Sequence, residues 1–280
     1  MAGGRPASGT RSHPAPGALI NLRIRRSGHA AIGRARAEEQ KTVAVLSGTA
    51  QQRYQGIGSL IVSARRLGEY REMFALSDAD LLGGPVLDVA GGASSFLADL
   101  VALGGTGCAV DPHYHRPAAE LTAAADRGAA LARTAITTWP ELYAEHVADA
   151  PVAYLAEWQH NLRRFEAHYR PGSAHYRAAS LPVLPFADGE FRIALSSHLL
   201  FSYPDDFGHD LLLASIAEMV RVSAVEARVY PLVDTMGRPY PELDRLRADL
   251  AERGVDTELR PVPFRLFKSG THAFVARRAA

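Results

Sequence analysis

The sequence predicts an α/β fold: a doubly wound, mostly parallel seven-stranded sheet with an antiparallel last strand, plus a helical cap insertion. Three observations predict this class. Residues 85–96 (PVLDVAGGASSF) combine a short apolar strand, a glycine turn and the start of a helix. Strand-like and helix-like segments then alternate along most of the chain. Two final strand-like segments flank Lys268-Ser-Gly270, which indicates a closing hairpin.

Length and composition limit the possible classes of protein. Of the 280 residues, 47% are hydrophobic and 22% are charged, which is enough for one substantial core. No apolar run reaches the length of about 18 residues that a membrane span needs, so we expect no membrane association. The single cysteine, Cys108, cannot form an internal disulfide, and no secretory segment is recognisable near the start. We therefore expect a cytoplasmic protein.

Charge is distributed unevenly along the chain. Residues 1–40 contain seven arginines and two glutamates, a formal charge of +5, whereas the whole chain carries +1 and the remainder is therefore −4. We interpret residues 1–45 as a disordered, arginine-rich tail and residues 46–280 as the folded domain. A mildly acidic domain argues against a nucleic-acid enzyme, because such enzymes carry a basic stripe on the folded part.

The elements around residues 85–96 form a strand, a turn and a helix, preceded by another helix. Apolar residues recur at helical spacing over residues 58–76, which predicts an amphipathic helix before the first strand. Gly91 and Gly92 remove the Cβ atoms that would keep a ligand from the backbone, and Ser94 and Ser95 offer an N-cap for the next helix. We expect free N–H groups at this turn, as in a nucleotide site.

A second strand, residues 107–110, ends in Asp111-Pro112. An acidic residue about 20 positions after a glycine-rich turn, at the end of the next strand, is placed to accept the two hydroxyls of a ribose. A carboxylate suits this role because its two oxygens match two adjacent O–H donors. The spacing from Asp88 to Asp111 therefore indicates a nucleotide-type cofactor.

Residues 116–177 form a long helical insertion where one crossover helix would suffice. Helices are expected over residues 117–136, 140–148 and 152–169, the last with apolar side chains at alternating spacings of three and four. The three histidines near this seam lack the spacing of a zinc-binding helix, so we expect no metal. The insertion is best interpreted as a cap over the site that shapes substrate choice.

The rest of the chain continues the alternation of strands and helices. Apolar runs bounded by Gly, Pro and Asp residues mark the elements. Strands are expected over residues 175–180, 191–197, 227–232, 258–266 and 271–277, and helices over residues 205–222 and 239–253.

This order of elements and motifs resembles the class I S-adenosylmethionine-dependent methyltransferases over residues 58–277. Residues 86–94 (VLDVAGGAS) resemble the family's first motif, residues 109–111 (AVD) its second, and residues 184–191 (LPFADGEF) the segment before its fourth strand. The resemblance implies S-adenosyl-L-methionine as the cofactor. It also implies the following cofactor-binding residues: Asp88, Ala90, Gly91, Gly92, Asp111, Pro112, Ser180, Leu181, Ser196 and Ser197.

Chemistry is expected at the end of the fourth strand. Methyl transfer from a sulfonium is an in-line displacement, so the enzyme aligns the reactants and, for some acceptors, removes a proton. His198 is the base-capable residue at that position, with a structural histidine as the alternative. Candidate substrate contacts are Tyr203, Trp158 and Asp234, each with packing or loop capping as the alternative role, and Arg65 and Tyr70, with a solvated helix face as the alternative.

The motifs depart from the family pattern in two places. Glycines common in the first motif are replaced by Ala90 and Ser94, and Ser180 stands where an acid usually lies beside adenine. We expect methyl transfer to a small molecule or a short peptide. Two alternatives stay open: a catalytically silent methyltransferase-like partner protein and, disfavoured by the absence of Gly-x-Gly-x-x-Gly, an NAD-dependent oxidoreductase.

Overall fold

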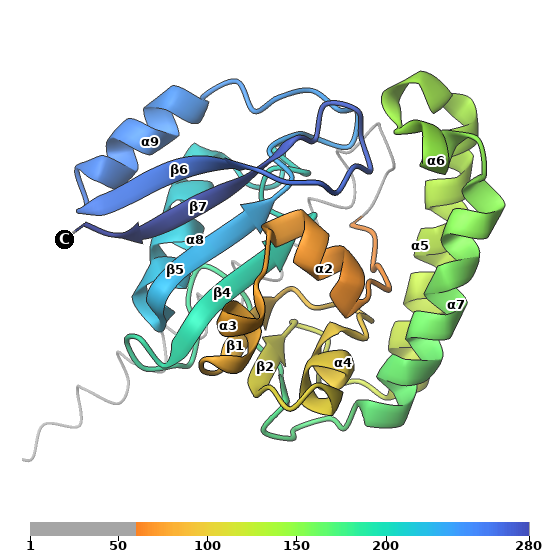
Figure 1. Ribbon diagram of the computed structural model, residues 1–280, viewed down its shortest axis with the longest axis horizontal. Helices are drawn as coiled ribbons and strands as arrows, with labels where there is room; N and C mark the ends of the chain where they lie inside the picture. Colours follow the sequence, from red (N-terminus) through yellow and green to blue (C-terminus); the bar gives the residue numbers. More distant parts are fainter. Residues whose placement is uncertain (1–59, 280) are drawn as a thin grey trace, which may run out of the picture. The chain divides into compact units, whose positions relative to one another are not determined.

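The computed structural model describes residues 60–279, in which one seven-stranded sheet forms the centre (Figure 1). The strand order is β3-β2-β1-β4-β5-β7-β6. The first five strands pair in parallel, and β7 runs antiparallel to both β5 and β6. The predicted fold class is confirmed. The strand bounds are β1 Val86–Val89, β2 Gly107–Val110, β3 Tyr176–Arg177, β4 Phe191–Ser197, β5 Ser223–Tyr230, β6 Val255–Pro261 and β7 His272–Arg278.

Helices cover both faces of the sheet, as a doubly wound fold requires. Helices α8 and α9 pack on one face, and α2, α3 and α4 lie on the other (Figure 1). The insertion contributes α5, η1, α6 and α7. The helix bounds are α2 Leu67–Phe74, α3 Asp78–Leu82, α4 Phe96–Ala102, α5 Ala118–Thr138, η1 Pro140–Leu142, α6 Glu145–Ala148, α7 Pro151–His168, α8 His209–Val222 and α9 Leu243–Ala251.

The central strands are buried on both faces, which explains their unbroken apolar runs. Val86 in β1 belongs to the core beneath α2, α4 and α7, whereas Leu87 and Val89 belong to the core beneath α8 and α9. Successive side chains of a strand point to opposite faces, so one short strand supplies both cores. Continuous hydrophobic strands of this kind are typical of parallel sheets covered on both sides.

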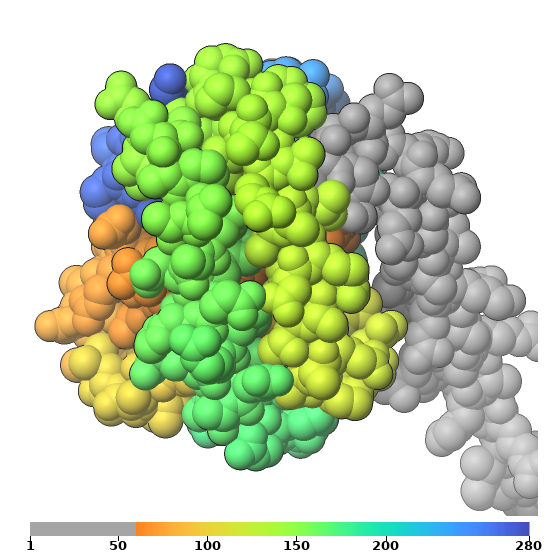
Figure 2. Space-filling model, turned by 90° about the vertical axis from the view of Figure 1, so that its right-hand side faces the viewer, coloured from red at the N-terminus to blue at the C-terminus, as the bar shows by residue number. Residues whose placement is uncertain are grey.

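The insertion packs as a helical pair beside the sheet. Helix α7 buries Leu155, Trp158, Leu162 and Phe165, the seam that its sequence predicts. Helices α5 and α7 contact each other along their length, and Figure 2 shows them side by side in front of the segment that carries α2. The helices expected in the insertion are present, and the buried face of α7 is apolar except for Asn161, whose amide donates to the carbonyl of Ala64 at 2.8 Å.

The helix expected over residues 58–76 is wrong in its first half. Residues 60–66 have no regular secondary structure, and α2 begins only at Leu67; residues 58 and 59 lie outside the described part. The carbonyls of Ser63 and Arg65 accept hydrogen bonds from the backbone N–H groups of Ala93 and Ser95, at 3.1 and 2.8 Å. Because these carbonyls point towards the glycine turn, they are not aligned to accept the hydrogen bonds of a helix of their own. We call residues 60–66 the strap.

Other element boundaries differ by a few residues from those expected. The third strand has only two residues, since Ser180 instead forms a bridge with Val183 around a cis Leu181–Pro182 bond. The sequence also places the start of the fifth strand four residues too late, because β5 begins at Ser223 directly after α8. The predicted tail, residues 1–45, lies outside the described residues.

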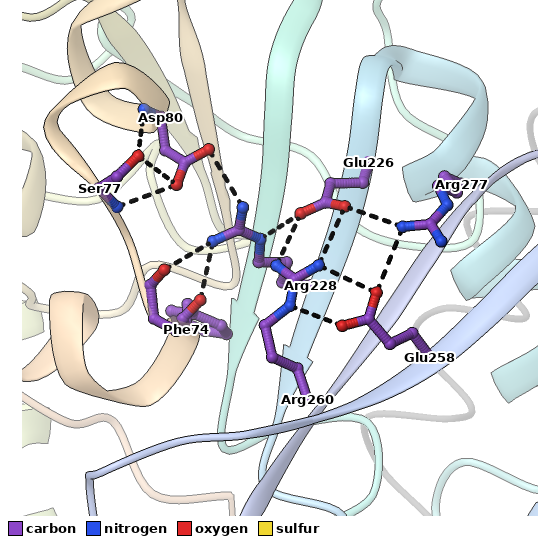
Figure 3. Close-up of polar contacts among 9 residues, drawn as sticks. Phe74, Ser77, Asp80, Glu226, Arg228, Glu258, Arg260 and Arg277 are labelled. Atoms are coloured by element: carbon purple, nitrogen blue, oxygen red, sulfur yellow. Dashed lines mark hydrogen bonds and ion pairs between the residues drawn. The ribbon is translucent and has the colours of Figure 1, made fainter.

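A network of charged side chains ties α2 and α3 to the sheet (Figure 3). Arg228 of β5, 4% exposed, donates to the carbonyl of Phe74 at the end of α2 (2.8 Å), to Asp80 of α3 (3.1 Å) and to Glu226 (2.6 Å). Arg260 of β6 also contacts Glu226, at 3.0 Å. A cation at the carboxyl end of a helix is favourable. The network therefore fixes the helix that follows directly on the strap.

Candidate functional site

The carboxyl ends of three neighbouring strands meet at one cavity. Val89 of β1 is paired with Val110 of β2 on one side and with Ser196 of β4 on the other. The residues that follow these three, namely Ala90, Asp111 and Ser197, line a cavity of about 260 Å³. The strand order reverses between β1 and β4, and such switch points are where ligands bind in open α/β sheets.

The N–H groups of the glycine turn are not free, in contrast to our expectation. Ala93 and Ser95 donate to the strap, Gly91 donates to the carbonyl of Val110 at 3.1 Å, and the N–H of Phe96 bonds to the hydroxyl of Ser94 at 3.0 Å. The backbone N–H groups at the amino end of α4 are thus already hydrogen-bonded within the protein. A ligand at this site has to be held mainly by side chains and by the shape of the turn.

The two glycines of the turn serve different purposes. A Cβ atom at Gly91 would lie 2.6 Å from the hydroxyl of Tyr114, so this glycine makes room for a tyrosine beneath the turn, and it does not line the cavity. Gly92 does line the cavity and has φ +55°. Ala90, also at the cavity, has φ 59°, which is uncommon for a residue with a Cβ. The unusual backbone is concentrated where the cavity begins.

Asp111 is the only carboxylate among the described residues that line the cavity. One of its oxygens accepts from the N–H of Gly92 (3.2 Å) and the other from the N–H of His113 (2.9 Å). Burial raises its pKa, although both backbone N–H groups oppose that shift. Each carboxylate oxygen has a further lone pair, so Asp111 can still accept two hydroxyl donors. The adjacent Pro112, together with Ser180 and Leu181, lines the same cavity.

His198 lies at the end of β4 and faces the cavity. Its Nδ1 is 2.9 Å from the hydroxyl of Ser197, and its Nε2 is 3.5 Å from Nη2 of Arg65. Burial and the charge of Arg65 hold its pKa well below the ordinary value of 6.5. A guanidinium can only donate, so Nε2 carries the lone pair and Nδ1 the proton. His198 is therefore a neutral imidazole. Its backbone φ is 52°, in the left-handed region, which is strained for a residue with a Cβ.

Arg65 is the only lysine or arginine among the described residues that line the cavity, and it is 3% exposed. It donates from Nη1 to Glu69 (2.8 Å) and to the hydroxyl of Tyr154 (2.9 Å). Its guanidinium carbon lies 5.9 Å from the ring centroid of Trp158. Burial alone would lower the pKa of Arg65, but Tyr154 and Glu69 raise it above the ordinary value. Arg65 is a permanent cation in an apolar wall.

Two further candidate substrate contacts, Tyr203 and Trp158, also line the cavity. The hydroxyl of Tyr203 accepts from the N–H of Ile61 at 3.1 Å, so this side chain anchors the strap to the loop after β4. Trp158 projects from α7 and packs into the core beneath the insertion. The insertion and the strap therefore meet the strand ends at one place.

Four of the expected site residues, in addition to Gly91, do not line the cavity. Asp88 and Tyr70 are buried beneath the turn, where the tyrosine hydroxyl donates to the carboxyl at 3.0 Å. Ser196 is fully buried within β4. Asp234 caps its own loop, accepting from the N–H groups of Met236 (2.8 Å) and Arg238 (2.9 Å). Loop capping, the alternative role that the sequence left open for Asp234, is thus the observed one.

The structure also brings in residues that the sequence did not single out. Tyr154 lies one helical turn before Trp158 on α7, so the seam spacing could have pointed to it. Ile61, Val62 and Ser63 of the strap could not have been found, because the segment was expected to be helical. The cavity is further lined by Ile136, Tyr143, Phe207, Thr235, Leu266 and Phe267.

The Asp88 carboxyl beneath the turn has an unusual titration. Burial raises its pKa to about 7; the Tyr70 hydrogen bond opposes this shift and the charge of Asp111 adds to it. The folded state therefore binds the proton more tightly than the unfolded state. Stability from this group is fully present below the unfolded value of 3.8 and is lost as the pH rises towards about 7.

Replacing Asp88 with asparagine should remove this loss. The amide of the variant keeps an oxygen that can accept from Tyr70 and carries no charge. Asp88→Asn should therefore be more stable than the unsubstituted protein above neutral pH, by about a few kcal/mol at most. At acidic pH the two proteins should unfold alike. Urea unfolding across this pH range measures the effect. A difference that does not change with pH would contradict the assignment.

Within residues 60–279 two features are absent: a metal-binding group of side chains and a helix that could span a membrane. In this part of the chain no three His, Cys, Asp or Glu side chains are grouped in a way that could hold a metal ion. None of the helices described here is long and apolar enough to cross a membrane.

Comparison with known proteins gives distant similarities. No family model matches the chain. A protein of Methanocaldococcus jannaschii, "Uncharacterized protein MJ0045", is 24% identical over 230 residues, which cover 81% of this chain and 100% of that protein. Among solved structures, magnesium protoporphyrin IX methyltransferase of Synechocystis PCC 6803 with bound S-adenosylmethionine has a TM-score of 0.41 at 13% identity, over 72% of this chain and 73% of that one.

A second structure, the 1,6-didemethyltoxoflavin-N1-methyltransferase of Burkholderia thailandensis, has a TM-score of 0.36 at 16% identity and covers 96% of this chain and 94% of that chain. The deciding observation is the sheet itself, with its order β3-β2-β1-β4-β5-β7-β6 and its reversed β7. This strand order and the reversed β7 are what the resemblance to the class I methyltransferases predicts. In this fold the cavity described above lies at the switch point between β1 and β4.

Proposed function

We propose that this protein is an S-adenosylmethionine-dependent methyltransferase that acts on a small molecule. One observation carries the proposal: a single cavity at the switch point is lined by Gly92, Asp111, Ser180 and His198, which come from four separate segments of the chain. The resemblance in sequence assigned three of these residues to the cofactor and one to chemistry. Their convergence supports that assignment.

The residues present fit the cofactor. Asp111 has two unused lone pairs for the ribose hydroxyls, as argued above, and Ser180 can accept a hydrogen bond from an adenine amino group. Gly92 has no side chain to obstruct an approach to the turn. When bound, S-adenosylmethionine supplies a methyl group on a positively charged sulfur, which is activated for displacement.

The protein's own contribution is alignment and exclusion of water. The strands β2 and β4 are two strand spacings apart, about 10 Å, so Asp111 and His198 stand at opposite sides of the cavity. We assign the Asp111 side of the cavity to the cofactor and the His198 side to the acceptor. There the Nε2 lone pair of His198 faces Nη2 of Arg65, and the imidazole and the guanidinium together can position an acceptor group for in-line attack.

The acceptor side of the cavity is apolar and aromatic. Tyr143, Trp158, Leu266 and Phe267 line it, and all four lie outside the strands that hold the cofactor residues. Such a wall suits a small, flat organic molecule, and a short peptide could enter only by an apolar side chain. A nucleic acid would need basic residues around the opening, and the lining contains one arginine among the described residues.

Thermal unfolding with three ligands tests the proposal. S-adenosylmethionine and S-adenosylhomocysteine should each raise the melting temperature, because a ligand that binds only the folded state stabilises it by mass action. NAD should have no effect. Stabilisation by NAD alone would favour the oxidoreductase alternative, and stabilisation by none of the three would argue against this cofactor.

A further inference from the structure

We propose that the acceptor presents an anionic oxygen, a phenolate or a carboxylate, and that Arg65 is its charge partner. This inference rests on the proposed function and concerns the acceptor alone. It starts from a contrast within one wall of the cavity, where a buried cation stands next to a histidine that is a poor base.

The wall contains N–H donors that lack acceptors. Within residues 60–279, no hydrogen-bond acceptor meets Nε of Arg65 or Nε1 of Trp158, and both atoms are buried. Both residues line the cavity, and the guanidinium carbon lies 5.9 Å from the indole ring centroid. Buried donors are normally satisfied, and an unpaired one is costly. A bound oxyanion is the kind of group that would satisfy donors of this type.

The charge of Arg65 is only partly used. Glu69 and Tyr154 engage Nη1, and Nη2 contacts only the neutral His198, which leaves Nε without an acceptor among the described residues. Tyr154 and His198, the remaining polar neighbours of Arg65, carry no charge of their own in the resting state. The rings of Trp158 and Phe264, the latter 5.5 Å away, lower the local polarity. A positive guanidinium edge in such surroundings attracts an anion more strongly than it would in water.

His198 is unsuited to take a proton from a weakly acidic acceptor. Its pKa lies well below 6.5, and a proton on Nε2 would be repelled by Arg65. An acceptor that is already anionic needs no such proton transfer, and Arg65, which lines the cavity beside His198, favours that form. A protonated amine is disfavoured at the same place, because its positive charge would lie beside the guanidinium.

The displacement is balanced without a proton in the step. The oxygen anion attacks the methyl carbon, the new O–C bond forms, the C–S bond breaks, and its electron pair remains on the sulfur. The products are a methyl ether or a methyl ester together with S-adenosylhomocysteine, whose sulfur is neutral. One negative and one positive charge disappear in a nonpolar cavity, which is favourable for the transition state.

Binding of charged and neutral probes to the unsubstituted protein tests the inference. With S-adenosylhomocysteine present at saturation, and at a pH where the nitrophenol is ionised and the amine is still protonated, calorimetry would compare 2-naphthoate, 4-nitrophenolate, 2-naphthylmethanol and 2-naphthylmethylammonium. At least one anion should bind about tenfold more tightly than the alcohol and the ammonium. Tighter binding of 2-naphthoate would indicate a carboxylate acceptor, and tighter binding of 4-nitrophenolate would indicate a phenolate. Equal or tighter binding of the ammonium, or no binding of either anion, would overturn the inference.

Variants of Arg65 give the second readout. Arg65→Gln should weaken the preferred anion about tenfold and leave the affinity for S-adenosylhomocysteine unchanged, whereas Arg71→Gln, at a partly exposed arginine of α2 paired with Asp78, should change neither. Loss of S-adenosylhomocysteine binding in Arg65→Gln would assign Arg65 to the cofactor and overturn the inference while the proposed function stands. If Arg65→Gln does not fold, the charge preference of the unsubstituted protein decides.

Discussion

Asp111→Asn should bind S-adenosylmethionine at least about tenfold more weakly than the unsubstituted protein, the largest expected loss of cofactor affinity. Hydrogen bonds to a charged acceptor contribute about 1.5 to 3 kcal/mol each, and the amide lacks both the charge and one acceptor oxygen. Isothermal titration with S-adenosylmethionine and S-adenosylhomocysteine measures the change. Both ligands contain the ribose, so they should be affected equally.

The fold should survive this substitution, because the remaining oxygen of the amide can still accept from Gly92 or His113. Asp256→Asn is the matched control, since Asp256 is exposed on β6. It should bind both ligands as before. Unchanged affinity in Asp111→Asn, with a normal melting temperature, would rule out the proposed ribose contact.

His198→Ala should lower the turnover rate by about 100-fold or more, with cofactor affinity within a few-fold of the original, because an acceptor group that is no longer oriented reacts slowly. The rate is measured as transfer of a labelled methyl group into the small-molecule fraction of a cell extract. His160→Ala, at an exposed position of α7, is the control and should leave the rate unchanged.

The pH dependence separates an orienting histidine from a titrating base. Since the pKa of His198 lies well below 6.5, the imidazole stays neutral through the neutral range and the rate should show no step near that pH. A rate limb close to pH 6.5 that disappears in His198→Gln would show instead that His198 titrates normally and takes the acceptor proton.

The sequence was most informative where the spacing of residues along a strand or a helix determines where their side chains lie in the fold. Parallel pairing of β1 with β2 and β4 brings Ala90, Asp111 and Ser197 into one row, and the two-residue period of strands and the glycine turn predicted that row. The seam of α7 likewise predicted Trp158 at an inner face, because a helix places residues three and four apart together.

The sequence failed where the outcome depends on contacts between distant segments. The apolar spacing of residues 60–66 fits a helix, but the bonds from Ala93 and Ser95 to its carbonyls favour an irregular strap. Tyr70 was a candidate substrate contact, yet its hydroxyl bonds to Asp88 and its ring stacks on Phe96, 4.2 Å between centroids. No local pattern encodes such pairings, so they could not have been predicted from one sequence.

The central claim is that this protein transfers a methyl group from S-adenosylmethionine to a small molecule. The most direct measurement incubates it with methyl-labelled S-adenosylmethionine and a cell extract, and then fractionates the products. We expect label in a small organic product, greatly reduced with Asp111→Asn. Label in RNA, or tight binding of the cofactor with no label transferred to any fraction, would contradict the claim, and the second outcome would favour a catalytically silent partner protein.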